Sequence, residues 1–503
     1  MSAPDDWTDL RVTVAGLGVS GPPVARALGA RGAEVTAVDA RDDDARRALA
    51  AELERDGIRV RLGDGDTLPD PTDLIVTSPG WRPDTPLLAA AAKSDIPIIG
   101  DVELAWRLRP VLPGGGRQRW LGVTGTNGKT TTVKMLEAML LAAGRRAIAA
   151  GNVGTPLVDV VLADDPYEVV AVELSSFQLH WSASLAPLAA TVLNVAPDHI
   201  DWHGTLEAYA ADKGRIYAPG TLIVANADDA WSRDLADRAA DAARAGGTEP
   251  RTVAFTLRTP ALGQLGVVDD LLVDRAFVVD DTAARSAPVG LVAGRGAGPA
   301  EGAELAALDD VRPAAPHNVA NALAAAALAR AEGVPAGAVR DGLRAFRPEP
   351  HRISHVATRD GVDYVDDSKA TNPHAAAASL AAYPSIVWIA GGLLKGASVD
   401  DLVADAAPRL RAVVALGTDR DLVREAVARH APNVPVVDVP GTDTGVMRTV
   451  VREANRLARP GDTVLLAPAA ASLDMFANYN ARGDAFAAAV GGLGGPGPDA
   501  PGA

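Results

Sequence analysis

The sequence predicts an α/β protein built from three domains in tandem, and three observations support that prediction. The chain is 503 residues long, which is more than one hydrophobic core usually supports. Short apolar runs alternate with helical segments along the chain, as strands and helices do in parallel-sheet folds. Pro- and Gly-rich stretches at 109–118 and 346–352 divide these alternations into three groups. We therefore expect domains at 1–112, 113–347 and 348–490, with a disordered tail at 491–503.

The composition excludes several classes of function. The chain contains no cysteine, so disulfides, thiolate metal sites and cysteine nucleophiles are absent. Its net charge of −16 argues against nucleic acid as a partner. No apolar run approaches the roughly 18 residues that a membrane helix needs, and the acidic first residues carry no secretory signal. We expect a cytoplasmic protein without membrane insertion.

The first domain begins with a predicted strand, glycine turn, helix and second strand at residues 11–40. Gly16, Gly18 and Gly21 have the spacing of a dinucleotide-binding turn, and Asp39 ends the second strand. This pattern fits NAD, but also any other pyrophosphate that backbone N–H groups at a helix start can hold. The run at 73–80 predicts another strand that ends in a glycine turn at the same edge. A Rossmann-like domain is therefore expected here.

The central domain begins with a strand that leads into a phosphate loop of unusual spacing. Val123 stands where the common P-loop has its first glycine, which alters the entry to the loop but not its phosphate contacts. Lys129 can reach the outer phosphates of a nucleotide, and the Thr130 hydroxyl can hold Mg²⁺. The alternative is a glycine-rich turn without a ligand. We predict an ATP site whose loop residues are Gly125, Thr126, Asn127, Gly128, Lys129, Thr130 and Thr131.

Two further strands of the central domain end in polar residues that suit a metal or a phosphate. The runs at 168–176 and 189–199 are apolar and place Glu173 and His199 at or beyond their ends. Because the carboxyl ends of parallel strands meet at one edge, both side chains are expected beside the phosphate loop. Residues 240–312 carry only short strand-like pieces. In the third domain, strands are predicted at 362–368, 385–392, 411–417, 434–439 and 463–470.

Several motifs together resemble those of the Mur ligase family, the ATP-dependent amide ligases that assemble the peptide of peptidoglycan. These motifs are GVTGTNGKTTT (122–132), ELSSFQL (173–179), NVAPDHIDWHG (194–204), HNVANALAA (317–325) and DDSKATNP (366–373). The similarity covers the chain except 240–312 and the tail, and the family's spaced-glycine loop accounts for Val123. DDSKATNP and PAAASLDMF (468–476) are similar to the motifs of members that attach D-glutamate to UDP-N-acetylmuramoyl-L-alanine.

The resemblance reinterprets the first glycine turn as a site for the UDP part of this sugar nucleotide. Asp39 and Arg41 would lie at the uridine, and Asn152 and His199 at the muramoyl end. The residues implied in sugar-nucleotide binding are Val19, Ser20, Gly21, Asp39, Arg41, Ser78, Gly80, Asn152 and His199.

For the ATP site, the resemblance implies two Mg²⁺ ions held by Thr130, Glu173, His199 and a carbamylated Lys213. Only six of the 48 basic residues are lysine, and arginine cannot be carbamylated in this way, so a lysine at 213 fits that role. Asn318 and Asn321 would contact adenine, Asp367 would hold the ribose, and Arg352 would reach the phosphates. The implied catalytic residues are Lys129, His199, Lys213 and Arg352.

For the amino acid, the resemblance implies a D-glutamate site in the third domain formed by Thr371, Lys395, Ser472, Leu473 and Tyr479. The implied reaction passes through an acyl phosphate, and we expect a monomer. Three alternatives stay open: another Mur-type or folylpolyglutamate-type amide ligase, an NAD-dependent dehydrogenase, and a scaffold that binds a precursor without catalysis.

Overall fold

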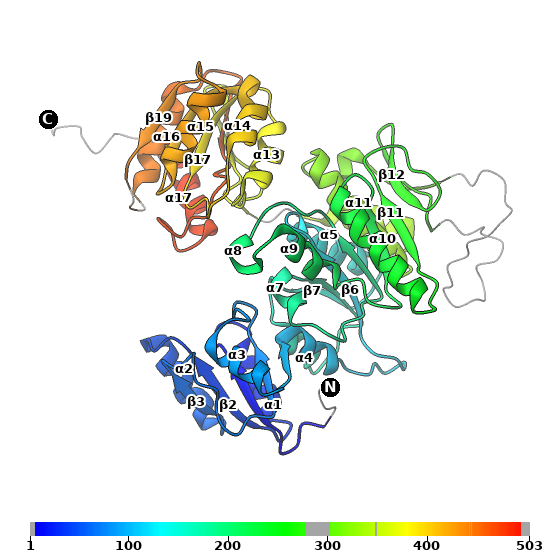
Figure 1. Ribbon diagram of the computed structural model, residues 1–503. Helices are drawn as coiled ribbons and strands as arrows, with labels where there is room; N and C mark the ends of the chain where they lie inside the picture. Colours follow the sequence, from blue (N-terminus) through cyan, green and yellow to red (C-terminus); the bar gives the residue numbers. More distant parts are fainter. Residues whose placement is uncertain (1–5, 278–301, 348–349, 442, 444, 494–503) are drawn as a thin grey trace. The chain divides into compact units, whose positions relative to one another are not determined.

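The computed structural model describes residues 6–277, 302–347, 350–441, 443 and 445–493, and it contains three separate sheets (Figure 1). The chain divides into two compact units, and the division falls between Phe346 and Arg347. Residues 196–198 belong to the second unit. The first unit holds two of the sheets and the second unit holds one. The predicted α/β class with three sheet domains is confirmed, and the exact domain boundaries stay a prediction. The predicted tail lies outside the described residues from residue 494 onward.

The first sheet has five parallel strands in the order β3-β2-β1-β4-β5. The order reverses between β1 and β4, which is where ligands bind in doubly wound sheets. The glycine turn therefore lies at the expected edge. Its strands are β1 (Arg11–Ala15), β2 (Glu34–Asp39), β3 (Arg59–Leu62), β4 (Leu74–Thr77) and β5 (Ile98–Gly100), and its helices are α1 (Gly21–Gly29), α2 (Asp44–Arg55), α3 (Pro86–Lys93) and α4 (Asp101–Arg107).

The central sheet has nine strands in the order β14-β13-β12-β11-β10-β9-β6-β8-β7. Seven of its strands are β6 (Arg119–Thr124), β7 (Ala147–Gly151), β8 (Val169–Glu173), β9 (Ala189–Val192), β10 (Leu222–Asn226), β11 (Thr252–Phe255) and β12 (Gln264–Val268), each parallel to its neighbour in this group. The pieces at 240–312 extend this sheet through β12 and the antiparallel strands β13 (Leu271–Asp274) and β14 (Ala303–Ala307), and residues 278–301 of that region lie outside the described part of the chain.

Helices cover the central sheet, and two of them pack against the helix that follows the phosphate loop. α5 (Lys129–Ala142) packs against α11 (Pro316–Ala331) and α12 (Ala336–Ala345). Small residues bring these backbones close together, because a Cβ on Gly342 would lie 2.5 Å from the Cα of Met139. The other helices are α6 (Leu157–Val161), α7 (Ser176–His180), α8 (Ile200–His203), α9 (Leu206–Gly214) and α10 (Ala230–Ala245), and a short 3₁₀ helix covers Leu308–Asp310.

A buried glutamate joins the first sheet domain to the central one. Glu103 on α4 has a fully buried side chain that accepts hydrogen bonds from the backbone N–H groups of Ala183 and Ser184, each at 2.9 Å. Burial raises the pKa of Glu103, but the hydrogen bonds from Ser184, Ala183 and Arg107 outweigh it and lower the pKa below its usual value. The two domains of the first unit are therefore joined by directional contacts as well as by apolar packing.

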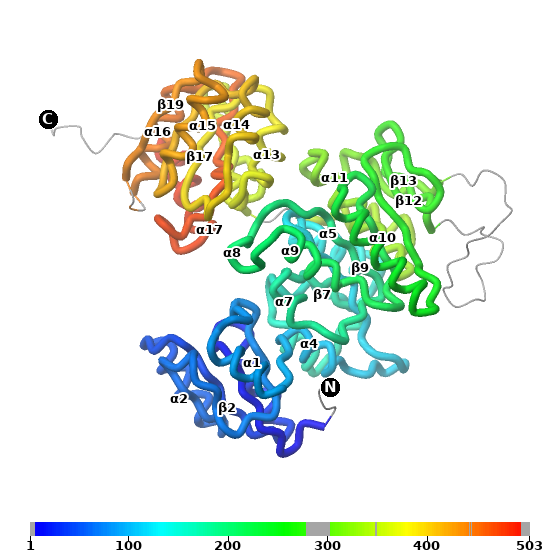
Figure 2. The backbone as a smooth tube through the Cα atoms, viewed as in Figure 1, coloured from blue at the N-terminus to red at the C-terminus, as the bar shows by residue number. Residues whose placement is uncertain are grey.

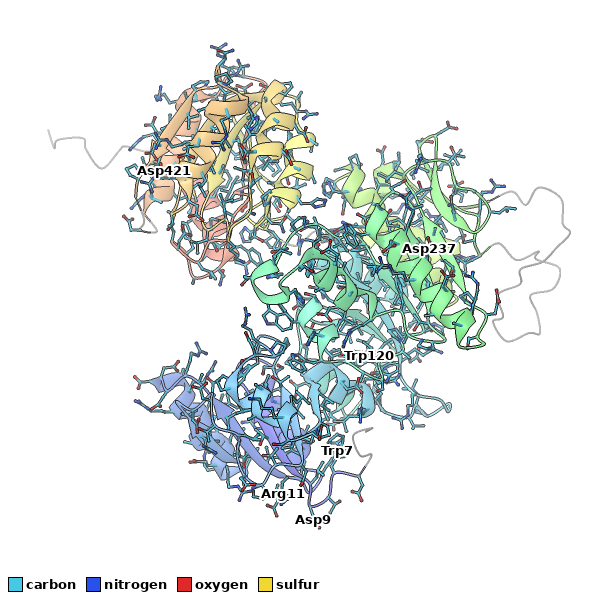
Figure 3. The ribbon with its side chains drawn as sticks, viewed as in Figure 1. Trp7, Asp9, Arg11, Trp120, Asp237 and Asp421 are labelled. Carbon is cyan, nitrogen blue, oxygen red and sulfur yellow. The ribbon has the colours of Figure 1, made fainter. Side chains whose placement is uncertain are left out.

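The stretch at 109–118, which we predict to be a domain boundary, contains side-chain contacts to its own backbone and to neighbouring rings. Arg109 lies over the ring of Trp106 and donates to the backbone oxygens of Trp106 and Gln118 at 2.8 and 3.1 Å. Trp106 in turn packs edge-on against Trp120 of β6, with 5.3 Å between ring centroids. Trp120 is labelled in Figure 3. The Pro and Gly content indicates a turn, and the arginine and the two tryptophans contact one another and the backbone within and beside it.

The second unit contains a six-stranded sheet in the order β15-β16-β20-β17-β18-β19. Figure 2 draws the backbone of this unit from yellow to red. All five predicted strands are confirmed as β16 (Val362–Asp366), β17 (Ile386–Gly391), β18 (Leu410–Leu416), β19 (Val436–Val439) and β20 (Thr463–Leu466). Sequence reasoning missed β15 (Ser354–Arg359), an antiparallel edge strand whose residues are only partly buried.

Both faces of this sheet are covered, so successive residues along a strand enter different cores. Trp388 lies in the core that includes residues of α13 (Pro373–Ala381), α14 (Asp400–Ala406) and α15 (Arg420–His430). Its neighbour Val387 lies in the core that includes residues of α16 (Val446–Leu457) and α17 (Tyr479–Gly491). This alternation is why the strands are continuous apolar runs. Among the described helices, none has both the length and the apolar character needed to cross a membrane.

Candidate active site

The phosphate loop connects β6 to α5 and depends on glycine for two separate reasons. Gly125 and Gly128 have φ angles of 147° and 85°, a region that L-residues with side chains rarely adopt. In addition, a Cβ on Gly128 would lie 2.3 Å from Oδ1 of Asn321 on α11. The loop can therefore approach α11 closely only because residue 128 has no side chain.

Two lysines converge on the backbone carbonyl groups of this loop. Lys129 donates from Nζ to the carbonyl oxygens of Gly125 and Thr126 at 2.9 and 3.0 Å. Lys213, which is 1% exposed on α9, donates from Nζ to the same Gly125 oxygen at 2.9 Å. Two predicted catalytic residues from distant parts of the chain are thus brought together. Their positive charge lies beside the start of α5, whose first amide groups already favour an anion.

Asn194 holds the loop from the neighbouring strand, and sequence reasoning missed it. Its backbone oxygen accepts from the Thr126 N–H at 2.9 Å, and its side-chain Oδ1 accepts from the Asn127 N–H at 2.9 Å. Its Nδ2 group donates back to the Asn127 carbonyl at 3.2 Å. The available signal was its place just after β9, which is the strand paired with β6.

Glu173 ends β8 and presents a carboxylate that is only half satisfied. The residue is 2% exposed, and its Oε1 accepts a hydrogen bond from Nδ2 of Asn152 at 2.8 Å. Its Oε2 is buried and has no hydrogen-bond partner among the described residues. A buried carboxylate oxygen without a donor is costly, and a bound cation would satisfy it.

The oxygen atoms around the loop fit Mg²⁺ in the manner of nucleotide sites. Mg²⁺ is usually held by one or two protein oxygens together with substrate phosphates and water. The Glu173 carboxylate and the buried Thr130 hydroxyl are oxygen donors at two adjacent strand ends. The part of the chain that the structure describes contains no group of three or more His, Cys, Asp or Glu side chains able to hold a metal by themselves.

His199 and Lys213 are placed by a group of aromatic side chains. His199 has a φ of 53° at the start of α8, and its ring packs edge-on against Phe177, with 4.8 Å between centroids. Lys213 Nζ lies 4.3 Å from the centroid of the Tyr209 ring, and the Tyr209 hydroxyl is 3.2 Å from Oγ1 of Thr126. Tyr209, which sequence reasoning also missed, therefore links α9 to the phosphate loop.

The predicted adenine-contacting pair lies beside the same loop. Asn318 and Asn321 are both buried on one face of α11, with 3.5 Å between Asn321 Nδ2 and Asn318 Oδ1. Asn318 donates to the carbonyl of Pro313 at 2.9 Å, which fixes its orientation. Burial lowers the pKa of the preceding His317, so its neutral form is favoured. The pair is thus near the loop, as predicted, and its contact with adenine stays a prediction.

The first glycine turn is held closed by an acid and a hydroxyl. Asp39, at the end of β2, accepts from the backbone N–H groups of Leu17 and Arg41 at 2.7 and 2.9 Å. The Ser78 hydroxyl donates to the carbonyl of Gly16 at 3.1 Å. A Cβ on Gly21 would lie 1.9 Å from that same carbonyl oxygen, so the turn closes only with glycine there. Asp39 is 7% exposed and bonds within the protein, and its predicted role at the uridine stays a prediction.

A second acid near this turn was not found from the sequence. Asp101 begins α4 at the end of β5, and its Oδ1 is buried with no hydrogen-bond partner in the described parts of the chain. Burial raises the pKa of Asp101 to about 6, against the opposing effect of hydrogen bonds from the Val102 amide and the Ser20 side chain. Its contact with Ser20, a predicted diphosphate residue, places it beside the turn. The exposed Val19 completes the turn's outer surface.

In the second unit, the predicted D-glutamate residues follow three neighbouring strands, β16, β20 and β17. Leu393 and Ala471 exchange two backbone hydrogen bonds of 2.9 Å, which join the loop of Lys395 to that of Ser472. The Ser368 hydroxyl donates to the Tyr479 carbonyl at 2.7 Å. The predicted residues Thr371, Lys395, Ser472, Leu473 and Tyr479 therefore come from segments that meet at one sheet edge.

A buried arginine on α17 fastens two of these segments together, and sequence reasoning missed it. Arg482 is 1% exposed and donates to the backbone oxygens of Ser368 and Ala470 at 2.8 and 3.0 Å. Burial lowers the pKa of Arg482 to about 10. Its guanidinium spans the DDSKATNP and PAAASLDMF motifs, and this explains why both motifs form one surface.

The segment that carries Arg352 has an unusual backbone. The flanking residues His351 and Ile353 have φ angles of 63° and 47°, and the His351 ring is 2.6 Å from Asp366. Asp367 accepts from the Ile353 N–H at 3.3 Å and from the Ser379 hydroxyl, and burial raises its pKa to about 6. The Asp367 carboxylate is thus engaged within the protein, and its predicted contact with the ribose stays a prediction.

Three family models match the chain in order. They are the N-terminal domain of the MurD-like Mur ligases over residues 10–100, the Mur ligase middle domain over 123–250, and the Mur ligase glutamate ligase domain over 351–470. Together with near-full-length relatives, they show that the chain belongs to the Mur ligase family.

Two curated relatives narrow the comparison to one member of that family. A Streptomyces avermitilis protein named UDP-N-acetylmuramoylalanine–D-glutamate ligase is 62% identical, over 97% of this chain and 99% of its own length. A Thermobifida fusca protein of the same name is 61% identical, over 96% of this chain and 99% of its own.

Solved structures agree on the fold. A UDP-N-acetylmuramate–alanine ligase from Thermotoga maritima matches with a TM-score of 0.54 and 19% identity, over 96% of this chain and 99% of that one. A type C pseudomurein peptide ligase from Methanothermus fervidus matches with a TM-score of 0.54 and 18% identity, over 95% and 99% of the two chains. At these identities the likeness establishes the fold alone.

Proposed function

We propose that this chain is an ATP-dependent ligase that joins D-glutamate to UDP-N-acetylmuramoyl-L-alanine, a step in making peptidoglycan precursors. The observation that supports this most strongly is the 62% identity, along nearly the whole chain, to a relative named for that substrate and amino acid. The phosphate loop and its lysines are the parts that an ATP-driven amide synthesis requires.

In the proposed reaction, a carboxylate oxygen of the L-alanine attacks the γ-phosphorus of ATP. The bond to the leaving ADP oxygen breaks, which gives an acyl phosphate. The amine of D-glutamate then attacks the acyl carbon, gives up a proton, and displaces phosphate. Both steps depend on positioning and on neutralising the transferred charge.

Different residues of the central domain would bind the phosphates, the adenine and the Mg²⁺ ion. Lys129 and the amide groups of the loop would bind the phosphates, and Asn318 with Asn321 would bind adenine. Thr130 and Glu173 would hold Mg²⁺, and the unpartnered Oε2 of Glu173 supports that assignment. When bound, Mg²⁺ would offset negative charge on the phosphoryl group. Arg352 would add a further positive charge at the phosphates.

Lys213 is proposed to act as a carbamate that helps to hold a second Mg²⁺, together with His199. The neutral amine would add to CO₂, forming one C–N bond and releasing one proton to solvent. The product is an anion, so the buried side chain would then face the Lys129 ammonium with opposite charge. Its burial and its shared contact with Gly125 support this proposal.

Replacing Lys213 by arginine tests the carbamate directly. We expect Lys213→Arg to lose on the order of 100-fold in the rate of phosphate release, since guanidinium forms no carbamate and no metal ligand. Lys93→Arg, at an exposed position on α3, is the matched control and should keep the full rate. Equal rates for the two variants would contradict the role given to Lys213.

The substrates would bind at the other two sheet edges. In the first domain, Val19, Ser20, Gly21 and the turn with Ser78 and Gly80 would bind the UDP group, with Asn152 and His199 toward the sugar. In the second unit, Lys395 and Thr371 would bind the two carboxylates of D-glutamate, and Ser472, Leu473 and Tyr479 would enclose it. Because all these residues come from one chain, we expect a monomer, which light scattering would test.

The decisive experiment measures phosphate release from ATP with UDP-N-acetylmuramoyl-L-alanine present. We expect release with D-glutamate and none with L-glutamate, D-aspartate or no amino acid. Release with L-glutamate and a folate would instead indicate a folylpolyglutamate-type ligase. ATP binding without release under every condition would favour a scaffold.

A further inference from the structure

An aspartate next to Lys213 receives hydrogen bonds from two histidines. Oδ2 of Asp212 lies 2.9 Å from Nδ1 of His180 and 3.1 Å from Nδ1 of His203. A carboxylate oxygen accepts hydrogen bonds, so a histidine that bonds to it does so through an N–H group at Nδ1. Oδ1 of Asp212 also lies 3.3 Å from Nε of Arg215.

These contacts join three short helices that contain a proposed site residue or closely follow one. His180 is the last residue of α7, which begins three residues after Glu173. His203 is the last residue of α8, which begins directly after His199. Asp212 is in the final turn of α9, next to Lys213. One carboxylate is therefore a common contact for the three elements that position those residues.

His203 transmits this restraint toward His199. Its side chain is 1% exposed, and its Nε2 lies 2.9 Å from the hydroxyl of Ser176. Its ring is stacked on Phe177 at 5.4 Å between centroids, and Phe177 also packs against His199. A backbone hydrogen bond of 3.1 Å connects the His203 N–H to the His199 carbonyl. Holding His203 thus limits where the His199 ring can lie.

Asp212 also limits the rotation of α9 about its own axis. Tyr209 and Lys213 are four residues apart, so they share the face that meets the phosphate loop. Asp212 is displaced from Lys213 by about 100° around the helix. Fixing the carboxylate against the two histidines therefore fixes the direction from which the Lys213 side chain enters the site.

The arrangement of Asp212, His203 and Ser176 has the order of groups found in serine hydrolases, but its burial argues against that chemistry. Ser176 is 2% exposed and lies in the first turn of α7, so a substrate cannot reach its hydroxyl. A nucleophile must be accessible to the bond that it attacks. The network is suited to holding structure in place and not to hydrolysis.

We propose that Asp212 is a positioning residue for the ligase reaction: its contacts with His180 and His203 hold the Lys213 amine and the His199 ring at the second Mg²⁺ site. This inference rests on the proposed function, and in particular on the carbamate at Lys213. Asp212 itself touches neither substrate nor nucleotide in this role.

The test compares Asp212→Ala and Asp212→Asn with Glu207→Gln, which changes an exposed carboxylate on the same helix. The carbamate on Lys213 is measured by ¹³C NMR in ¹³C-bicarbonate, and phosphate release is followed as bicarbonate is varied. We expect Asp212→Ala to need on the order of 10-fold more bicarbonate for half-maximal rate, with a matching loss of carbamate signal. Asp212→Asn keeps one acceptor oxygen, so its bicarbonate requirement and its carbamate signal should lie between those of Asp212→Ala and the wild type. Glu207→Gln should match the wild type in both.

A second variant separates the effect of the network on Lys213 from its effect on His199. His203→Ala leaves Asp212 in contact with His180, so the carbamate should be nearly unchanged. The KM for the sugar nucleotide should rise about 10-fold through the displaced His199, with the KM for ATP unaffected.

The outcomes are distinguishable. Folded Asp212 variants with wild-type carbamate and wild-type bicarbonate dependence would overturn this inference, even if their melting temperatures fell. An active wild type without carbamate would overturn it together with the proposed role of Lys213. A wild type inactive with D-glutamate would instead overturn the proposed function. If Asp212→Ala does not fold, Asp212→Asn carries the carbamate test, and His203→Ala tests the restraint on His199.

Discussion

The two glycine turns of the first unit look alike in sequence and differ in what holds them. Each follows a strand of a parallel sheet and leads to a helix, β1 to α1 and β6 to α5. The first turn is held by an acid, because Asp39 accepts from the amide of Leu17. The second turn is held by basic side chains, because Lys129 and Lys213 donate hydrogen bonds to its carbonyl groups.

This difference indicates which ligand each turn suits. Glycine spacing shows only that the backbone bends sharply and can be approached closely. In the first turn one amide is already used by Asp39, so fewer donors remain for a diphosphate. In the second turn Lys129 covers the carbonyl groups of Gly125 and Thr126, and it stays positively charged when Lys213 is carbamylated, which suits a triphosphate. An aspartate contacts the first turn and a lysine ammonium contacts the second, and this separates the two turns.

The largest expected effect on activity comes from removing the lysine side chain that directly follows the second turn's glycines. Lys129→Ala should lower kcat/KM for ATP on the order of 10³-fold, because the lysine neutralises the transferred phosphoryl charge. Binding of the sugar nucleotide, measured by calorimetry, should stay unchanged. Lys134→Ala is the control, since Lys134 lies one turn further along α5 and pairs with Glu137 at 3.0 Å. A similar loss of kcat/KM for ATP in both variants would show that Lys129 has no special role at the second turn.

A smaller effect is expected from adding one methyl group to either turn. Gly128→Ala places a Cβ 2.3 Å from Asn321 and forces a φ of 85° on a residue with a side chain. We expect about 1–3 kcal/mol of lost stability, and a KM for ATP raised about 10-fold as Asn321 moves. Gly18→Ala meets no described atom within 4 Å and should change the melting temperature little. Equal destabilisation by the two variants would contradict this explanation.

Removing the acid of the first turn should affect the other substrate. Asp39→Ala leaves the buried amide of Leu17 without an acceptor, at a cost of about 1–3 kcal/mol. The KM for the sugar nucleotide should rise several-fold by the same reasoning, while the KM for ATP stays constant. Asp42→Ala, at an exposed aspartate that pairs with Arg47, is the control. A change in the KM for ATP alone would show that the assignment of the two turns is wrong.

A substitution at Asp101 should affect turnover least. Its effect should appear in how the stability of the protein depends on pH. Burial raises the pKa of Asp101 to about 6, so the folded chain binds this proton more tightly than the unfolded chain. The stabilisation is fully present below the unfolded pKa of about 4 and is lost as pH rises through 6.

Asp101→Asn tests that dependence because asparagine does not titrate. The stability of the wild type relative to Asp101→Asn should fall by at most about 3 kcal/mol between pH 4.5 and 8. Melting temperatures of the two proteins across this range provide the measurement. Parallel curves would mean that Asp101 is not buried in its acid form.

The sequence by itself determined the strands that are buried on both faces and the residues that form the glycine turns. Strands such as β8 and β17 are continuous apolar runs because helices cover both sides of their sheets. The edge strand β15 was missed because its residues are partly buried or exposed and its side chains are mixed. Lys129 was predictable because it follows its glycine loop directly in the chain.

Only the tertiary structure decided how distant residues share one site. Gly125 and Lys213 are 88 positions apart, and their contact depends on the rotation of α9. Asn194, Asp212 and Arg482 act through hydrogen bonds to segments brought close by strand pairing and helix packing. A local sequence pattern reports backbone conformation and burial. It can place side chains at the same sheet edge, but the individual hydrogen bonds between them follow from the packing of whole elements.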